Sequence, residues 1–513
     1  IAYGHLLRGL VFFDQAKKIG RFVPVTRVFT LADSVACGIP MTATPAESYE
    51  YVVSDLEAAV KDLPVTAPAG IANKYAAEVI LSRACLQAYA YSGDSKYLDK
   101  AINAAHDVVA HNSLTTNYEG MFNETDELNK EILWGYYRLQ TNTTIGNYDE
   151  LVRTFPNIPN ADVTGALCPD PLKGKNGADT FTGWAIFFPT QDLVDQYLVI
   201  DEKSGEAKPW YETSQWKENV VEHDPLSVTV AGQIDTYNNK SGSPRRIPTP
   251  QDFMQLSSAH PAALRYSTLK DGCERDLSDL MYSNRDKRFD GTVVHDKSTW
   301  IKEYVTLNLS GNLSAGVRAK EDGGWYTTTT GYYWRKNSVA EPEPRVFPST
   351  SVPFHFCLAR VGEAYMNLAE AYLLKEEVEE AVDAMNMTRT VHGGLPESTA
   401  STLEEAWADY IRERRVEMAC EGQDIYFSYL RWGKYGGYAN HGRAAGDIIY
   451  DLDRPVYKIA ISRDRKSLLI NQLTLLNSAS RKFTQRRYLF PIPQNFLNTR
   501  EAYGLDHVQN ELW

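Results

Sequence analysis

Two arginines and two glutamates near residue 417 have the types and spacing of an acid–base cluster. Arg414, Arg415, Glu417 and Glu421 lie close together in the sequence, and carboxylates beside cations can act as general acids or bases. On a helix, however, residues three or four apart share one face and pair as ions. The spacing therefore favours ion pairs that tie helices together over catalysis.

The sequence has none of the short motifs that carry common reactions. It contains no HExxH, no GxSxG, no Walker loop and no GxGxxG opening a helix. The 10 histidines are scattered, and the 6 cysteines show no zinc-type spacing. We therefore predict no catalytic residue, no metal and no cofactor. A glycoside hydrolase stays an alternative, because carboxylates are abundant and no two of them stand out.

Aromatic side chains are the unusual feature of the composition. Tyr 31, Phe 18 and Trp 10 make up 12% of the 513 residues. Tyrosine and tryptophan supply rigid contact area with one polar tip, so an excess of them indicates a recognition surface.

The candidate stacking residues lie in a loop-rich part of the chain. Trp325 and Tyr326 follow a Gly-Gly turn beside polar residues, where a ring has little core to join. Trp300 follows a polar segment, and Trp210 and Trp216 lie in a charged stretch, 203–217. We predict that these five residues bind the ligand, in the order Trp325, Tyr326, Trp300, Trp210 and Trp216.

Two other tryptophans of the same region are predicted to be core residues. Trp184 precedes the apolar run 185–188, and Trp334 lies beside Tyr332 and Tyr333. Both environments are typical of buried rings.

Helical patterns flank the loop-rich region on both sides. The N-terminal pattern has a helix start at Thr44-Pro45, with Glu47 three residues after the cap. Apolar periodicity predicts further helices over 74–92, 96–111, 358–388 and 402–422. In 358–388, the spacing of small and aromatic residues resembles a tetratricopeptide helix pair.

Residues 113–354 contain turn-rich runs and short β-like segments such as 227–230 and 300–307. We predict a mainly α fold in which a helical scaffold is interrupted by a large loop-rich α/β insertion. The predicted parts are scaffold over 1–112, a ligand-binding insertion over 113–354, scaffold over 355–432, and an extension packing on the scaffold over 433–513.

The charge balance excludes one class of partner. Lys+Arg 53 against Asp+Glu 66 gives a net charge of −13, whereas a protein that binds nucleic acid through the phosphates needs a basic face. No run approaches 18 apolar residues, so no membrane span is predicted. Because Ile1 opens the chain within a helical pattern, we expect the natural N-terminus to lie outside it.

Several segments, taken in order, resemble the SusD/RagB family of surface nutrient-binding lipoproteins. The resemblance rests on PTQDLVDQY at 189–197, NRDKRF at 284–289, GYYWRK at 331–336, RVGEAYMNLAEA at 360–371, RRVEMACEG at 414–422, LRWG at 430–433 and RYLFPIPQ at 487–494. The second segment has Lys287 where the family usually has proline.

The resemblance implies a fold and a role. The fold would be a right-handed superhelix of tetratricopeptide-like helix pairs with a variable loop-rich subdomain. The role would be to capture oligosaccharides or polysaccharides without cleaving them and to deliver them to a SusC-like TonB-dependent transporter. It also implies attachment to the surface of the outer membrane through an N-terminal lipid anchor that precedes this chain.

Other functions stay open at this point. Some branches of the family bind peptides, so a peptide ligand is the first alternative to a glycan. A helical-repeat adaptor that binds another protein is the second, and its ligand would lie on the concave helix face. The motifs that carry the resemblance are structural, so they do not identify the ligand.

Overall fold

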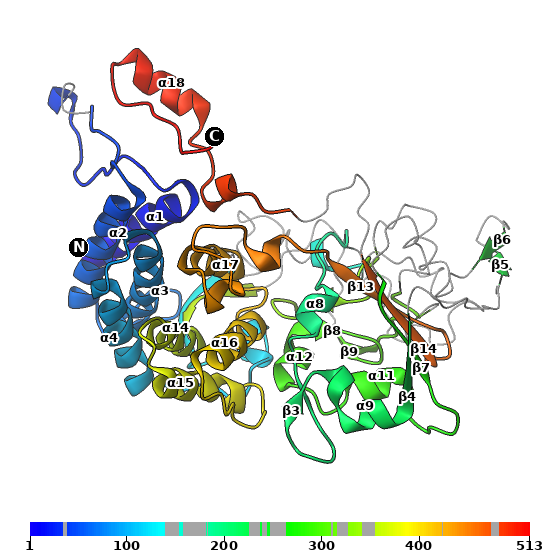
Figure 1. Ribbon diagram of the computed structural model, residues 1–513. Coiled ribbons are helices and arrows are strands. Elements are labelled where there is room, and N and C mark those ends of the chain that lie inside the picture. Colours follow the sequence, from blue (N-terminus) through cyan, green and yellow to red (C-terminus); the bar gives the residue numbers. More distant parts are fainter. Residues whose placement is uncertain are drawn as a thin grey trace.

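The computed structural model describes residues 1–33, 38–138, 153–156, 181, 183–224, 236–238, 244–246, 263–308, 311–314, 327–340, 354–422, 424–472 and 482–513. Figure 1 shows a helical body on one side and a mixed body of short helices and strands on the other. The protein is rich in helix, as the sequence predicts. The predicted strand 227–230 and the residues Trp325 and Tyr326 lie outside the described residues.

Four N-terminal helices form the first part of the helical body: α1 (Ala2–Ile19), α2 (Pro45–Asp62), α3 (Lys74–Ser92) and α4 (Lys96–His111). The Thr44 hydroxyl accepts a hydrogen bond from the Glu47 amide, which confirms the predicted start of α2. α3 and α4 match their predicted ranges. Gly93 ends α3 in the left-handed conformation at φ 68°, which allows the sharp turn into α4.

Four C-terminal helices complete the helical body: α14 (Val361–Leu374), α15 (Val378–Val391), α16 (Leu403–Glu417) and α17 (Asp424–Tyr435). The predicted capping box at Thr402 and Glu405 is confirmed. Two boundaries differ from the prediction. Residues 358–360 end strand β12 (Phe354–Arg360), and α16 stops before Cys420 and Gly422, which have positive φ values of 60° and 58°.

The two helical parts share one hydrophobic core although the insertion separates them in sequence. α14 packs against α3 and α4, and one cluster of buried residues extends from Leu6 to Tyr488. Burying large aliphatic and aromatic side chains contributes about 1.5–3 kcal/mol each, so this continuous core holds the body together. Figure 1 shows α14 beside the N-terminal helices.

The insertion contains short elements around separate small cores. Its described helices are α8 (Gln191–Val194), α9 (Ser214–Asn219), α11 (Leu277–Tyr282) and α12 (Lys287–Thr292). Its described strands include β1 (Ile132–Arg138), the pair β2 (Val199–Ile200) and β3 (Ala207–Lys208), the pair β5 (Thr236–Asn238) and β6 (Pro244–Arg246), β8 (Val293–Val294) and β11 (Tyr333–Trp334), and the hairpin β9 (Thr299–Trp300) and β10 (Glu303–Tyr304). β1 pairs antiparallel with β12 and joins the insertion to the helical body.

A four-stranded antiparallel sheet supports the far side of the insertion. Its strand order is β13 (Tyr457–Ile461), β14 (Ser467–Gln472), β7 (Ala263–Leu269) and β4 (Val220–His223). Two of these strands come from 433–513, which we predict from the sequence as an extension packing on the scaffold, and they pair instead with strands of the insertion. The difference arises because β14 completes the ladder of β7 and buries Leu468 and Ile470 in the insertion.

The end of the chain forms an arm with the segment after α1. α18 (Gln494–Ala502) buries Leu497 with Met41 and Ile492 in a small core of its own, and Figure 1 shows it beyond α1 and α2. No helix in the described ranges is both long enough and apolar enough to cross a membrane.

Candidate functional site

Two of the predicted ligand-binding tryptophans are core residues of the insertion. Trp210 and Trp216 are 0% and 1% exposed, and their rings meet edge to face at 4.5 Å. Each indole N–H is also satisfied inside, Trp210 by Asp195 at 2.7 Å and Trp216 by Glu222 at 2.8 Å. The prediction that these rings stack on a ligand is wrong, because neither offers a face to solvent.

Trp300 is also buried, at 2% exposure. Its ring stacks on Tyr333 at 5.6 Å and meets Phe155 edge to face at 4.9 Å. Its indole N–H donates to the Ser338 hydroxyl at 3.3 Å. The prediction of a ligand-stacking role is wrong here as well, since the insertion uses this ring to build a core that its small strands cannot supply.

The two predicted core tryptophans have different outcomes. Trp184 is 40% exposed, so that prediction is wrong: only part of the run after it is buried, with Ala185 at 6% but Ile186 at 53% and Phe187 at 50%. Trp334 is half-buried in β11, next to the fully buried Tyr333, so it is a core residue only in part.

An open groove lined by aromatic side chains lies where β1 meets the helical body. We call this cavity, of about 570 Å³, the aromatic groove. α1, the α2–α3 loop, the segment before β1, β1 itself and β12 all contribute to it, through Tyr3, Ala69, Gly70, Ile71, Glu127, Leu128, Trp134, Gly135, Tyr136, Tyr137, Arg138 and Leu358. The groove therefore joins residues that are far apart in the sequence.

The rings of the groove are held by their neighbours. The Trp134 indole N–H donates to the Gly70 carbonyl at 3.2 Å. The Tyr137 ring stacks on His355 at 5.5 Å, and its hydroxyl donates to the Glu127 carbonyl at 3.1 Å. Because these side chains are fixed before any ligand arrives, little conformational entropy is lost on binding.

Gly135 makes room for the Tyr137 ring because glycine has no side chain. A Cβ placed on Gly135 would lie 2.6 Å from the Tyr137 ring, far inside van der Waals contact. Glycine at this position in β1 therefore allows the ring to lie close over the strand backbone.

The open side of the groove is apolar with a few polar groups. Leu128 is 65% exposed, Ile71 47%, Tyr136 43% and Leu358 37%. The Arg138 guanidinium lies 5.7 Å from the centroid of the Tyr136 ring, which orients the ring by a cation–π contact. Flat rings beside a guanidinium suit a ligand with an apolar face and hydroxyl groups at its edge.

Sequence reasoning missed this groove because it ranked isolated tryptophans in loops. The available signal was the run Trp134-Gly135-Tyr136-Tyr137, in which three aromatic residues fall in four positions of one strand. A strand backed by a large core holds side chains in place more firmly than a loop does.

Beside the groove, buried ions tie the insertion to the helical body. We call this network the ionic junction: Glu131, Asp286, Arg288, Lys336, Arg360, His392, Glu413, Glu417 and Glu421. Arg288 of α12 pairs with Glu413 at 2.7 Å and Glu417 at 3.2 Å on α16. Arg360 pairs with Glu417 at 2.6 Å.

The ionic junction confirms the interpretation of the charges near residue 417 as structural ion pairs. Their partners lie on other elements, however, since Arg414 pairs with Asp424 at 2.7 Å and Arg415 with Asp192 at 3.2 Å. The junction also fixes one end of the β1–β12 pair, because Glu131 directly precedes β1 and Arg360 is the last residue of β12.

His392 is the one histidine in the junction. Burial disfavours its charged form, but Glu417 and Glu131 outweigh this and raise the pKa of His392 to about 9. Burial likewise opposes the ionisation of Glu417, yet His392 and Arg360 lower its pKa well below the usual range. Glu131, His392 and Glu417 have ligand atoms within 4.8 Å of one another, but both imidazole nitrogens already contact these carboxylates, so ion pairing accounts for the group.

A model of the SusD family matches residues 130–513 of this chain. The chain belongs to the SusD family. Similar solved structures include a SusD-like protein from Bacteroides fragilis, with 20% identity, a TM-score of 0.65 and coverage of 100% of this chain and 79% of the other.

Two further structures share the fold. A SusD-like carbohydrate-binding protein from Bacteroides fragilis has 18% identity and a TM-score of 0.59, covering 97% of this chain and 78% of the other. A structure with xylogluco-oligosaccharide has 16% identity and a TM-score of 0.55, covering 100% and 82%. No curated protein matches the sequence.

In this SusD-family chain, the segments that carry the resemblance build the ionic junction. Arg288 lies in 284–289, Lys336 in 331–336, Arg360 in 360–371, and Glu417 and Glu421 in 414–422. These segments position the body and the insertion, whereas none of the residues that line the aromatic groove lies in them. This explains why they identify the family without identifying a ligand.

Proposed function

We propose that the protein binds glycans without cleaving them and that the ligand stacks in the aromatic groove. The observation that carries the proposal is the set of aromatic side chains that line the groove along β1, among them Tyr136 at 43% exposure. The SusD-like carbohydrate-binding neighbour and the neighbour with xylogluco-oligosaccharide support it at the level of the family.

The groove favours binding over hydrolysis on chemical grounds. Glycoside hydrolysis generally needs two carboxylates on either side of the scissile bond. Among the residues that line the groove in the described chain, Glu127 alone has a carboxylate. The described residues of the groove therefore do not supply a general acid and a general base together.

The cellular role follows as part of the same proposal. The ligand would be held at the cell surface by a chain anchored in the outer membrane through a lipid at its N-terminal side, and handed to a SusC-like TonB-dependent transporter. Within the chain, 1–112 and 355–432 would serve as the scaffold, 113–354 as the ligand-binding insertion and 433–513 as the extension. The groove lies where the insertion begins, at β1.

A combined glycan and peptide array on the purified protein tests the proposal. We expect binding to oligosaccharides, and an assay for new reducing ends on the bound glycans should show no turnover. Turnover that a single carboxylate substitution abolishes would contradict the non-catalytic role. Binding of peptides in place of glycans would replace the proposed ligand by the peptide alternative.

A further inference from the structure

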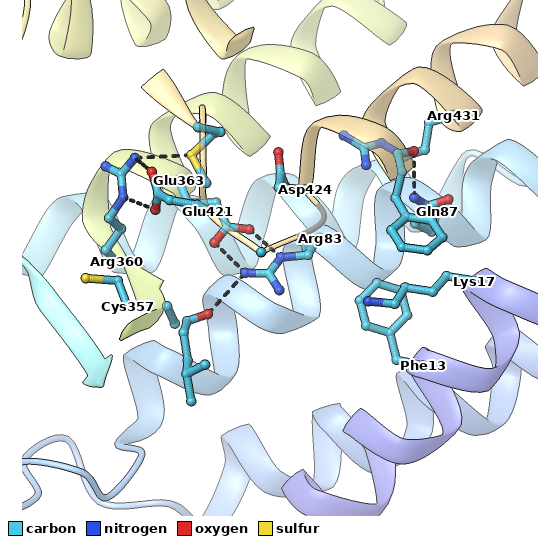
Figure 2. A pocket seen from close by; sticks show the side chains of 15 residues that line it. Phe13, Lys17, Arg83, Gln87, Cys357, Arg360, Glu363, Glu421, Asp424 and Arg431 are labelled. Atoms are coloured by element: carbon cyan, nitrogen blue, oxygen red, sulfur yellow. Dashed lines mark hydrogen bonds and ion pairs between the residues drawn. The ribbon is translucent and has the colours of Figure 1, made fainter. Parts of the chain in front are cut away.

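A second cavity lies behind the aromatic groove, between α1, α3, β12 and α17. Figure 2 shows the side chains that line it. Its volume is about 200 Å³, or roughly six to seven times the share of one water molecule in the liquid. This is room for one small functional group and its neighbours. We call the cavity the cationic pocket and define it by Lys17, Arg83, Gln87, Leu358 and Phe427.

Most of the charges around the cationic pocket are already paired. The carboxylates that line it are Glu363, Glu421 and Asp424. They pair with Arg83 at 2.5 Å, with Arg360 at 2.7 Å and with Arg414 at 2.7 Å respectively. Arg431 pairs with Glu370 at 2.8 Å.

Lys17 is the exception. Its nearest carboxylate is Asp14 at 3.5 Å, which is 49% exposed and also pairs with Lys18 at 2.9 Å. The Lys17 ammonium instead lies over the Phe427 ring, 4.7 Å from the centroid. Burial, followed by the nearby charge of Arg83, lowers the pKa of Lys17. The Lys17 side chain is 21% exposed, so its ammonium is partly removed from water, and among the described residues only the exposed Asp14 carboxylate pairs with it.

Arg83 brings a second donor into the same space. Its Nε and Nη2 atoms donate to Glu363, and Nη2 also donates to the Leu358 carbonyl at 3.2 Å. Among the described residues, no acceptor forms a hydrogen bond with the Nη1 atom of Arg83. In Figure 2 the guanidinium of Arg83 and the ammonium of Lys17 reach the pocket from different helices. Two cationic donors therefore face one cavity.

The cationic pocket is next to the aromatic groove. Leu358 lines both cavities, and α1 contributes Tyr3 to the groove and Lys17 to the pocket. These two residues are 14 positions apart on one helix, nearly four full turns, so they share a face and are about 20 Å apart along the axis. Because Leu358 borders both cavities, an extended ligand that lies in the groove can place a substituent in the pocket.

We propose that the cationic pocket receives an anionic substituent, a carboxylate or a sulfate ester, of the glycan that lies in the groove. The proposal rests on the proposed glycan function and makes its ligand an acidic glycan. The anion would accept hydrogen bonds from the Lys17 ammonium and from Nη1 of Arg83. Such charge-assisted bonds are the stronger kind, and the anion also relieves the repulsion between the two cations.

The pocket should favour anions at short range although the chain as a whole is negatively charged. At −13 the protein repels acidic glycans in general, but at physiological salt this repulsion is screened beyond about 8 Å. Lys17 and Arg83 are half-buried, at 21% and 25% side-chain exposure, so their charges are screened less than charges on the open surface and decide the preference at short range. The preference for an anion should therefore survive a rise in salt concentration better than a contact on the surface would.

Small probes test the cationic pocket without relying on the groove. Binding of D-glucuronate, glucose 6-sulfate and glucose to the full chain is measured by titration calorimetry or ligand-observed NMR. We expect at least one of the two anions to bind at least tenfold more tightly than glucose. Binding of one anion alone identifies the substituent as a carboxylate or as a sulfate ester.

Lys17→Met is the variant for this test, because methionine keeps an unbranched apolar side chain at this position and removes the ammonium group. We expect it to lose the preference for the anion by at least tenfold with the melting temperature unchanged. Lys18→Met is the matched control on the same helix, since Lys18 also pairs with Asp14 but does not line the pocket. It should keep the preference.

Equal affinity for the anions and glucose, or a preference that Lys17→Met retains, would overturn the proposal of an anion pocket. Tighter binding of a short acidic peptide than of either sugar anion would overturn the assignment to a glycan. These results differ from a failure of the groove. In that case Tyr136→Ala would leave glycan binding unchanged while Lys17→Met still abolished the preference for the anion.

Discussion

The insertion and the aromatic groove both contain large aromatic side chains, but they use them in opposite ways. Trp210, Trp216 and Trp300 are nearly inaccessible and contact other rings. Tyr136 is 43% exposed on a strand whose neighbours fix the rings beside it. The difference is one of support, because β1 and β12 contribute to the large helical core, whereas the rest of the insertion must build its own small cores.

This comparison shows what a loop-rich subdomain requires. Its strands are mostly two residues long, so backbone pairing and aliphatic side chains bury little area. A tryptophan buries about 150–250 Å², which makes it the most effective residue for closing such a core. A ring can be displayed to a ligand only where another part of the molecule already provides the stability.

The largest expected effect comes from the interior of the insertion. Trp300→Ala should lower the free energy of unfolding by about 3–5 kcal/mol, because it leaves a cavity between Tyr333 and Phe155. Chemical denaturation measures the change. Tyr304→Ala, at a residue that is 46% exposed on the neighbouring strand, is the control and should change stability by less than about 1 kcal/mol. A similar loss in both variants would break the comparison.

The ionic junction should have the next largest effect, since it anchors the groove strands. Glu417→Gln leaves Arg288 and Arg360 with less buried negative charge and should cost about 3 kcal/mol or more. Glu404→Gln, at an exposed position of the same helix, should be neutral. The two melting temperatures give the result, and a neutral Glu417→Gln would show that the junction does not hold the two parts together.

The pH dependence of stability tests His392 in the same junction. Its pKa is raised from 6.5 to about 9 in the folded protein, so its contribution is fully present below pH 6.5 and is lost as the pH rises through 9. A shift of this size corresponds to on the order of 3 kcal/mol. The wild type should therefore lose more stability than His392→Gln between pH 6.5 and 9. Parallel pH profiles of the two proteins would contradict the assignment.

A smaller effect is expected at Gly135, where the absence of a side chain shapes the groove. Gly135→Ala places a methyl group 2.6 Å from the Tyr137 ring, so the ring must move. We expect a severalfold loss of glycan affinity and about 1–3 kcal/mol of destabilisation from overpacking. Gly4→Ala is the control, since nothing lies within 4 Å of its added Cβ. Unchanged affinity in Gly135→Ala would show that the Tyr137 ring is not part of the binding platform.

Much of the scaffold follows from the sequence because local signals and packing agree there. Thr44, Thr402 and the apolar periodicity of 74–111 each fix a helix through nearby residues. The candidate site does not follow in the same way. Tyr3, Gly70, Tyr136 and Leu358 meet only through tertiary packing, and a turn beside polar residues does not reveal whether a ring such as Trp300 faces inward.

The affinity of Tyr136→Ala for the glycan identified on the array tests the central claim most directly. Tyr136 lines the groove and is 43% exposed, so its loss should weaken binding by about 2 kcal/mol, or roughly thirtyfold, with the melting temperature unchanged. Tyr304→Ala, which removes an equally exposed tyrosine from the insertion, should bind like the wild type. Unchanged affinity in Tyr136→Ala, or a loss in Tyr304→Ala instead, would contradict the placement of the ligand in the aromatic groove.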